Sequence, residues 1–237
     1  MKFIRIIVFV FTVLVLSLPL HSLAAEEVNV DTIKEKYWAK GEQAEMGVVQ
    51  NRLYSKARKF EVGFYGGIIS SDPFLTVKNA GASVGFHFSE YLGLNFIAWK
   101  SYSSPSTALQ TFEETIGATT NNNKPQGFYG AEGAASILYG KLSLVGRKII
   151  YYDFHLLGGV GQTQTESGNY ITPFAGLGQQ TYLSSFFSLR IDYRLMRYEE
   201  TIIEKVITPK LGKPVGNRIN WSNSITVGIT LLWGPGK

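Results

Sequence analysis

The chain has no cysteine, so it forms no disulfide bond and has no cysteine to which a lipid could be attached. Charged residues are also scarce, at 17% of the chain, whereas ordinary globular domains have about 25%. The net charge of +5 includes Lys2 and Arg5 at the start, and so small an excess does not indicate a nucleic acid partner. The sequence shows no metal-ligand spacing, phosphate loop or dinucleotide fingerprint, so neither a metal nor a cofactor is expected.

A long apolar run lies near the start of the sequence. It spans residues 6–18, follows a basic start and is ended by Pro19. Ser22 and Ala24 supply small residues for a cleavage site. The run is short for a membrane-spanning helix, and an uncleaved anchor would need a longer one. Residues 1–24 are therefore predicted to be a cleaved secretory signal peptide.

Apolar and polar residues alternate most clearly in residues 220–233, which read N-W-S-N-S-I-T-V-G-I-T-L-L-W. Side chains alternate between the two faces of a strand, so one face is nearly all apolar and the other is small and polar. The polar face has no charge, although a soluble strand with one wet face would usually show Lys or Glu there. An apolar face on lipid and a small-residue face in a narrow lumen explain this pattern, which favours a transmembrane β-barrel.

The same strand resembles the assembly signal of bacterial outer-membrane barrels. That signal has a polar residue, a glycine two places later, and apolar residues at the sixth and eighth places, the last of them aromatic. These places are filled by Thr226, Gly228, Leu231 and Trp233. The resemblance implies recognition by the barrel-assembly machinery and insertion into the outer membrane of a Gram-negative cell, in contact with its lipid.

Seven further stretches alternate in the same way and are predicted to be strands: residues 60–68, 80–88, 92–101, 136–145, 150–161, 170–182 and 187–195. Short links at residues 89–90, 146–148 and 183–184 alternate with long ones at residues 70–77, 103–130, 162–169 and 199–218. Outer-membrane barrels have short periplasmic turns and long outer loops. The sequence therefore predicts an all-β fold, an eight-stranded antiparallel up-and-down transmembrane β-barrel over residues 59–237.

Residues 25–58 are mixed in charge and predict a short, partly helical periplasmic extension. A plug inside the barrel is the less favoured interpretation, because side chains already fill a lumen of eight strands. Within the longest loop we expect a helix at residues 106–116 and an exposed turn at residues 121–125. A soluble lipocalin-like barrel is the alternative fold. It would need bulky residues inside and charges outside, whereas here the charged residues share a face with the glycines.

The predicted lumen face carries the ionisable side chains Glu61, His87, Lys141, Asp153, His155, Arg190, Asp192 and Arg194. All of these except His87 are predicted to form its polar network. Buried charges must be paired, and eight strands leave an interior about wide enough for side chains to fill. We therefore expect a closed network of ion pairs and no open, porin-like channel. Asp153 and His155 stand two apart on one face, as a catalytic pair could. Ion pairing explains them better, and no catalytic residue is assigned.

His87-Phe88-Ser89 is the sharpest indication of an enzyme. Barrel lipid A deacylases look similar in having a His-x-Ser on one strand face. Here the motif lies next to a predicted periplasmic turn, and no Asn follows Ser89. A lipid-modifying enzyme of the outer membrane is therefore kept as an alternative, and a protein that is not an enzyme is favoured.

Residues 48–61, which include Q-N-R-L-Y-S-K at 50–56, resemble a family of outer-membrane β-barrel domain proteins from deltaproteobacteria of the Myxococcus and Bdellovibrio kind. The resemblance continues through D-P-F at 72–74, G-K-L-S at 140–143 and Y-D-F at 152–154. It implies an eight-stranded barrel with a short N-terminal extension, and no settled activity. Some similar barrels look like parts of envelope-spanning motility machines, so a subunit of such a complex is a second alternative. The leading prediction is a structural or interaction barrel that presents its loops and tail to envelope proteins.

Overall fold

The computed structural model describes residues 53–144 and 148–234. The predicted signal peptide and residues 25–52 of the predicted extension lie outside the described residues. Within the described ranges the chain forms the following elements: β1 (Phe60–Ser70), β2 (Leu75–His87), β3 (Leu92–Pro105), α3 (Thr107–Ile116), β4 (Pro125–Leu144), β5 (Lys148–Thr165), β6 (Gly168–Tyr182), β7 (Phe187–Ile203), the 3-10 helix η1 (Thr208–Lys210) and β8 (Pro214–Trp233).

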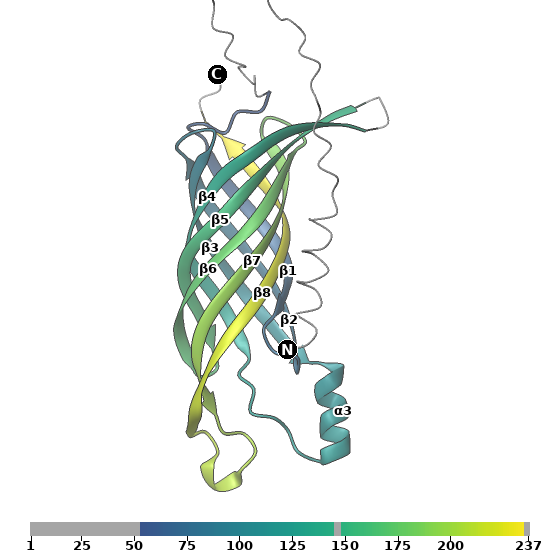
Figure 1. The fold of residues 1–237 in the computed structure, drawn as a ribbon, viewed down its shortest axis with the longest axis vertical. Helices are drawn as coiled ribbons and strands as arrows, with labels where there is room; N and C mark the ends of the chain where they lie inside the picture. Colours follow the sequence, from purple (N-terminus) through teal and green to yellow (C-terminus); the bar gives the residue numbers. More distant parts are fainter. Residues whose placement is uncertain (1–52, 145–147, 235–237) are drawn as a thin grey trace, which may run out of the picture. The chain divides into compact units, whose positions relative to one another are not determined.

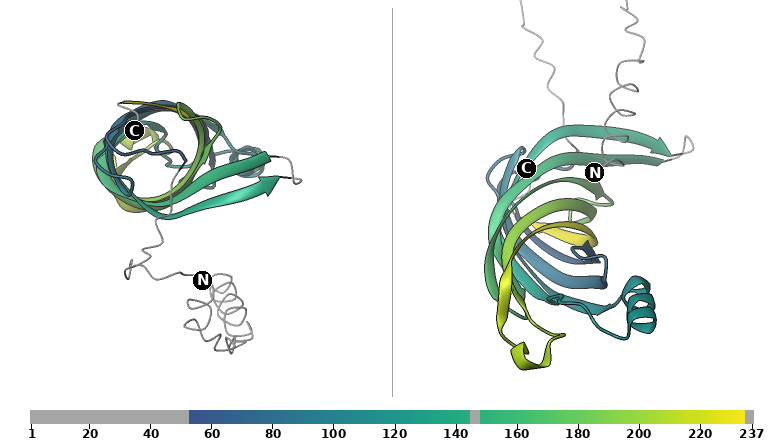
Figure 2. Two further views of the ribbon diagram at one scale, coloured as in Figure 1. Left: turned by 90° about the horizontal axis from the view of Figure 1, so that it is seen from above. Right: turned by 60° about the horizontal axis from the view of Figure 1, so that its bottom comes forward.

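The strands form a closed ring, in which each pairs antiparallel with the next and β8 returns to β1 (Figures 1 and 2). The closing ladder runs from Phe60 opposite Trp233 to Ser70 opposite Asn223. Closure joins the two strands that would otherwise be exposed edges. The predicted fold class, an eight-stranded antiparallel up-and-down barrel, is confirmed. We call the end with Phe60 and Trp233 the inner end, and the opposite end, which carries α3, the outer end.

The alternation of residues in the sequence becomes an alternation of exposure in the barrel. In β7, Arg190, Asp192 and Arg194 are buried, while the leucines and isoleucine between and beside them are exposed. The other strands present apolar side chains outward in the same way, among them Phe64, Ile68, Val84, Leu94, Phe96, Leu156, Val160, Leu177, Val227 and Ile229. Charges inside and apolar residues outside are the reverse of a soluble barrel, which the lipocalin-like alternative requires.

Several strands are longer than a membrane crossing requires. A transmembrane strand needs about 9–11 residues, whereas β4 and β8 have 20 residues each. The sequence placed the fourth strand at residues 136–145, but β4 already begins at Pro125. At the inner end the β4–β5 hairpin runs out beyond the ring of strands, as the view from above shows (Figure 2).

Strand extension also changes the links at the outer end. The prediction of a long loop at residues 162–169 is wrong. β5 continues to Thr165 and β6 begins at Gly168, so the two strands are joined by a turn of Glu166 and Ser167. The link between β1 and β2 is residues 71–74. The strict alternation of short and long links therefore fails, and the outer end carries two long links, residues 106–124 and 204–213.

The predicted helix in the longest link is confirmed as α3. Ser106 caps it, because its Oγ accepts a hydrogen bond of 3.3 Å from the backbone N–H of Leu109. Gly117 ends it in the left-handed conformation, with φ of 73°. The exposed turn predicted at residues 121–125 is wrong: Asn122 and Asn123 are buried, and β4 starts at the proline that follows.

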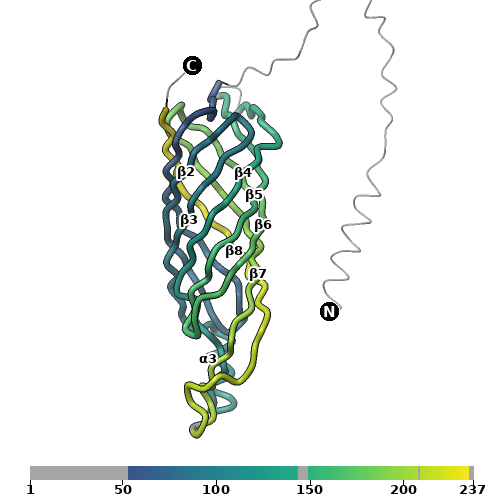
Figure 3. Tube along the Cα trace, turned by 90° about the vertical axis from the view of Figure 1, so that its left-hand side faces the viewer, coloured from purple at the N-terminus to yellow at the C-terminus, as the bar shows by residue number. Residues whose placement is uncertain are grey.

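The strands cross the barrel at a tilt, as closure of a sheet of eight strands demands (Figure 3). The two long outer links extend beyond the strands at the outer end. Among residues 53–144 and 148–234, no helix is both long and apolar enough to span a membrane.

Candidate functional site: the closed lumen

Arg190 stands at the centre of a layer of charged side chains inside the barrel. Its Nη1 lies 2.8 Å from Glu61 Oε1, its Nη2 lies 2.9 Å from Glu132 Oε1, and its Nε lies 2.8 Å from Asp192 Oδ2. These carboxylates come from β1, β4 and β7, so a single guanidinium joins three strands across the lumen. The fixed fork of the guanidinium donors suits this kind of multiple carboxylate contact.

Arg194 extends the same layer toward the outer end. Its Nε lies 2.6 Å from Glu132 Oε2, and its Nη2 lies 2.8 Å from Asp192 Oδ2. Its Nη1 donates to Thr226 Oγ1 on β8 at 3.0 Å. Glu132 and Asp192 therefore each bridge both arginines, and these four charges with Glu61 form what we call the ion layer.

Glu132 is the member of the ion layer that the sequence did not predict. The preceding loop was expected to end at residue 130 and the fourth strand to begin near residue 136, so Glu132 was assigned to neither. The structure makes it wholly buried. The signal that could have found it is the G-A-E-G-A-A run at residues 130–135, where one acid stands among small residues like those of the other lumen faces.

Two histidines complete the charged layer. His87 Nε2 lies 3.0 Å from Glu61 Oε2, and His155 Nε2 lies 3.1 Å from Asp192 Oδ1. Gln180 adds hydrogen bonds from its Nε2 to Glu61, at 3.2 Å, and to Ser188 Oγ, at 2.8 Å. The predicted lumen residues on β1, β5 and β7 are thus all buried. Lys141 on β4 is the exception among the predicted lumen residues.

The predicted His-x-Ser motif does not form a pair. His87 is turned into the lumen toward Glu61. Ser89 lies in the β2–β3 turn, where its Oγ accepts hydrogen bonds from the backbone N–H groups of Tyr91 and Leu92, at 3.2 and 3.1 Å. Within the described ranges no hydrogen bond joins the two side chains, so the geometry gives no support to a nucleophile activated by this histidine.

Lys141 is a correction to the predicted network. It is exposed, and it lies on the part of the β4–β5 hairpin beyond Ala135, the last residue of β4 that pairs with β3. Its Nζ lies 5.7 Å from the centre of the Tyr151 ring. Alternation along a strand fixes the face of a residue, whereas the length of the barrel decides whether that face is enclosed.

A segment ahead of β1 closes the inner end of the lumen. Lys56 Nζ lies 2.9 Å from Asp153 Oδ2 and donates to Ser136 Oγ at 2.8 Å. The ring of Tyr54 stacks on Tyr182, with centres 5.6 Å apart. Residues 53–59, which we call the inner plug, therefore belong to the barrel and not to a separate extension. The prediction that placed all of residues 25–58 outside the lumen is wrong for this part.

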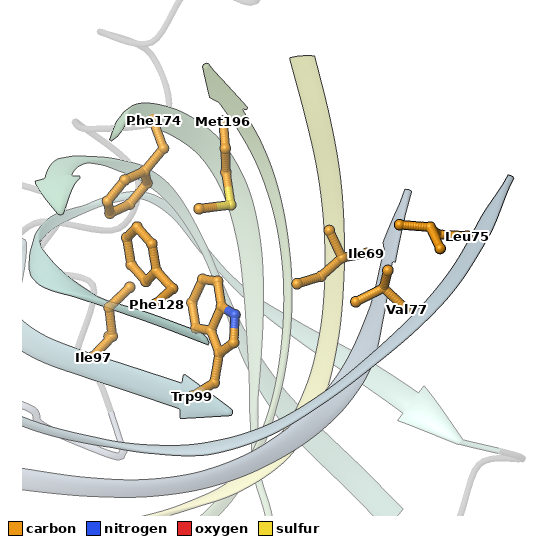
Figure 4. Packing of buried hydrophobic residues seen from close by; sticks show 8 residues of the cluster. All are labelled: Ile69, Leu75, Val77, Ile97, Trp99, Phe128, Phe174 and Met196. Carbon is orange, nitrogen blue, oxygen red and sulfur yellow. The ribbon is translucent and has the colours of Figure 1, made fainter. Parts of the chain in front are cut away.

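An apolar layer fills the lumen on the outer side of the ion layer. Trp99 stacks on Phe128 with ring centres 4.3 Å apart, and Phe128 meets Phe174 edge to face at 5.7 Å (Figure 4). The cluster consists of Ile69, Leu75, Val77, Ile97, Trp99, Phe128, Phe174 and Met196, all buried. The sequence analysis expected small and charged residues in the lumen and did not predict this apolar layer.

The remaining space inside the barrel is small. A cavity beside Glu132, Arg190 and Arg194 measures about 10 Å³, and another beside Trp99 and Met196 also measures about 10 Å³. Each is about the room of one water molecule. The inner plug, the ion layer and the apolar layer thus follow one another with no wide passage between them in the described part of the chain.

The four residues of the predicted assembly signal lie on β8. Thr226 faces the lumen and accepts from Arg194. Gly228 lies against β1, where an added Cβ would come within 2.2 Å of the carbonyl oxygen of Phe64. Leu231 is half-buried, and the exposed ring of Trp233 stacks on Phe186 with ring centres 6.3 Å apart. Contacts inside the barrel thus explain why a hydroxyl residue stands at position 226 and a glycine at position 228. Recognition of the strand by the assembly machinery stays a prediction.

No family model matches the chain, and no curated protein matches it. The resemblance to the deltaproteobacterial barrel family therefore stays a prediction. Among solved structures, the chain is similar to the outer membrane protein OprG from Pseudomonas aeruginosa, with 11% identity and a TM-score of 0.42 over 77% of this chain and 99% of that one.

It is also similar to neisserial surface protein A, with 13% identity and a TM-score of 0.37 over 75% of this chain and 97% of that one. The N-terminal β-barrel domain of Pseudomonas aeruginosa OprF shows 9% identity and a TM-score of 0.39 over 75% and 98%. At these values the likenesses carry no argument about function, and the fold is established by the strand pairing of this chain itself.

Proposed function

We propose that the protein is an outer-membrane β-barrel with a structural or interaction role, in which a sealed barrel holds its outer loops and its inner segment in place for partners in the cell envelope. The barrel carries no solute. This function needs three properties: a membrane-spanning surface, a closed lumen, and ordered structure at the barrel ends.

The outer surface supports a place in a membrane. Large apolar side chains cover the outward positions of all eight strands, and several are more than half exposed, such as Phe96 at 65% and Leu177 at 57%. A soluble monomer rarely exposes a continuous apolar surface of this extent. A closed barrel satisfies its backbone hydrogen bonds internally, which is what a hydrocarbon environment demands.

The observation that carries the proposal is the closure of the lumen by different means at successive levels. Lys56 and Tyr54 fill the inner end, the ion layer follows it, and the Trp99 cluster lies beyond that layer. A channel would need a continuous polar path, and an enzyme would need reactive groups that a substrate can reach. The charged groups here are engaged with one another and buried.

The outer links support a role in display, because they are held together by specific hydrogen bonds. Asn123 Nδ2 donates to Glu200 Oε2 at 3.0 Å and to the carbonyl oxygen of Thr201 at 2.8 Å. Asn121 Nδ2 donates to Glu204 Oε1 at 3.1 Å. The end of the β3–β4 link is thereby tied to the outer end of β7 and to the link that follows it.

Membrane placement and display are tested with single cysteines, which are unique because the chain has none of its own. Glu114 on α3 and Ser184 in the β6–β7 turn are both exposed. The Glu114→Cys variant should react with a membrane-impermeant maleimide on intact cells, and Ser184→Cys only after lysis. Labelling of both or neither on intact cells, or recovery of the protein outside the outer-membrane fraction, would contradict the proposal.

A further inference from the structure

The link between β7 and β8 ends in an exposed apolar surface. Val206, Ile207 and Leu211 in the link and Val215 at the start of β8 are exposed by 42, 50, 54 and 56%. We call these four residues the apolar tip. The link projects beyond the strands at the outer end of the barrel (Figure 1). Such a cluster of exposed apolar side chains on a loop is typical of an interaction site.

The charge around the apolar tip is positive. Lys210 and Lys213 are exposed, and neither forms an ion pair within the described residues. Lys205 is paired with Glu166, with its Nζ 2.6 Å from Oε2. Glu204 is the only acid in residues 204–215, and its carboxylate is turned into the link itself. The tip therefore offers apolar groups and two exposed lysines, with no competing exposed acid in the link.

The conformation of the link is held by hydrogen bonds and not by the apolar side chains. Glu204 Oε1 accepts from the backbone N–H groups of Val206 and Ile207, at 2.9 and 3.0 Å. The N–H of Gly212 donates to the carbonyl oxygen of Glu204 at 3.0 Å, and Gly212 has the left-handed φ of 76°. Apolar residues that do not build the link are free to contact another surface. Their presentation is already organised, which lowers the entropic cost of binding.

The tip lies clear of the membrane that holds the barrel. The apolar exterior of β7 reaches Leu195, and Arg197 and Glu199 beyond it are polar and exposed. On β8 the exposed apolar residues continue to Ile219, opposite Glu199. From Leu195 to Ile203 the strand advances roughly 25 Å at about 3.3 Å per residue, less the effect of tilt. The tip therefore faces outward, where a second surface can meet it.

We propose that the apolar tip docks on an anionic phospholipid bilayer apposed to the outer end of the barrel. Apolar side chains entering the interface and lysines beside anionic headgroups are the two features by which loops and amphipathic segments bind such surfaces. The neighbouring link has the opposite character, because α3 carries Glu113 and Glu114. The proposal rests on the proposed display of the outer loops, but its assay does not require intact cells.

The test uses the full mature barrel in nanodiscs of neutral lipid, mixed with separate vesicles and floated on a density gradient. The protein should float with vesicles of phosphatidylcholine and phosphatidylglycerol, and about tenfold less with phosphatidylcholine alone. Binding should fall as salt rises, because lysine attraction to the headgroups is screened.

Two variants test the tip itself. Leu211→Asp and Ile207→Asp should each reduce flotation about tenfold. Ile116→Asp is the matched control, because Ile116 is at least as exposed, at 60%, but lies at the end of α3. It should bind as the unchanged protein does. Heat-modifiable migration on a gel verifies that all three are folded barrels.

Absence of flotation by the unchanged protein would overturn the proposal, as would equal flotation with neutral vesicles or by the two tip variants. Retention on a poly-glutamate resin without flotation would overturn it in favour of an acidic protein partner. Failure of the proposed display function would appear instead in the cysteine labelling on cells, so the two failures are distinguishable.

Discussion

The ion layer and the apolar layer occupy neighbouring levels of one narrow lumen, yet they close it by different physics. In the ion layer two arginines share three carboxylates at distances between 2.6 and 2.9 Å, so each charge depends on particular partners. In the apolar layer Trp99, Phe128 and Phe174 pack by shape, and the contacts have no charge to balance. Removing one side chain of the ion layer therefore leaves a buried charge without a partner and should destabilise the barrel. The apolar layer tolerates exchange between side chains of similar volume.

The largest expected effect is in the ion layer. Glu132→Ala removes the carboxylate that both arginines contact, and it should lower the free energy of unfolding by about 3–5 kcal/mol, the usual cost of breaking a buried pair. Urea unfolding of the refolded barrel in detergent micelles measures the change. Glu132→Gln keeps nearly the same volume and one acceptor oxygen for the two arginines, so it should cost less than Glu132→Ala. A Glu132→Ala variant as stable as the unchanged protein would contradict the pairing.

A second expected effect concerns the inner plug. Asp153→Ala leaves the buried ammonium of Lys56 without this carboxylate and should cost on the order of 3 kcal/mol. Lys56→Met with Asp153→Ala removes both charges, so most of that stability should return. The same urea titration tests it, and equal stability of the single and double variants would contradict the pairing.

A smaller effect is expected in the apolar layer. Met196 packs in the cluster of Trp99 and Phe128. Met196→Leu keeps nearly the same volume and no charge, and it should cost less than about 1.5 kcal/mol. If this exchange proved as harmful as Glu132→Ala, the distinction between the two layers would be wrong. Unfolding followed by tryptophan fluorescence makes the comparison under identical conditions.

The smallest effect is expected for an ion pair outside the lumen. Lys205 and Glu166 pair at the outer rim, where both side chains keep contact with solvent. Burial raises the pKa of Glu166, but the hydrogen bonds from Lys205 and from the backbone of Lys124 outweigh it and hold this pKa below the ordinary 4.5. Glu166→Gln should cost less than about 1 kcal/mol.

Because the pKa of Glu166 is lowered in the folded state, the stabilisation by its carboxylate is present above the unfolded value and is lost as pH falls through the folded value. A difference between unchanged protein and Glu166→Gln that grew as pH fell below 4.5 would have the wrong sign. Urea midpoints measured across acidic pH give the answer.

Much of this architecture was predictable, because alternation with a period of two fixes the face of each residue wherever the strand is recognised. Arg190, Asp192 and Arg194 were placed correctly for that reason. Strand ends were harder, since Pro125 and the glycines and alanines after it have weak strand propensity, and only pairing with β3 and β5 makes this segment part of β4. Glu132 was missed in consequence. Lys141 and the buried Asn123 depend on where the ring ends and how the links fold back, which no local pattern encodes.

The most direct test of the sealed lumen is single-channel recording of the purified, refolded protein in a planar lipid bilayer. The inner plug, the ion layer and the apolar layer together predict no steady open current from the unchanged protein across a range of voltages. Met196→Leu, which keeps the apolar layer filled, should be equally silent. A stable, large conductance carried by the folded, heat-modifiable protein would show a water-filled path through the barrel and would contradict the closed-lumen account.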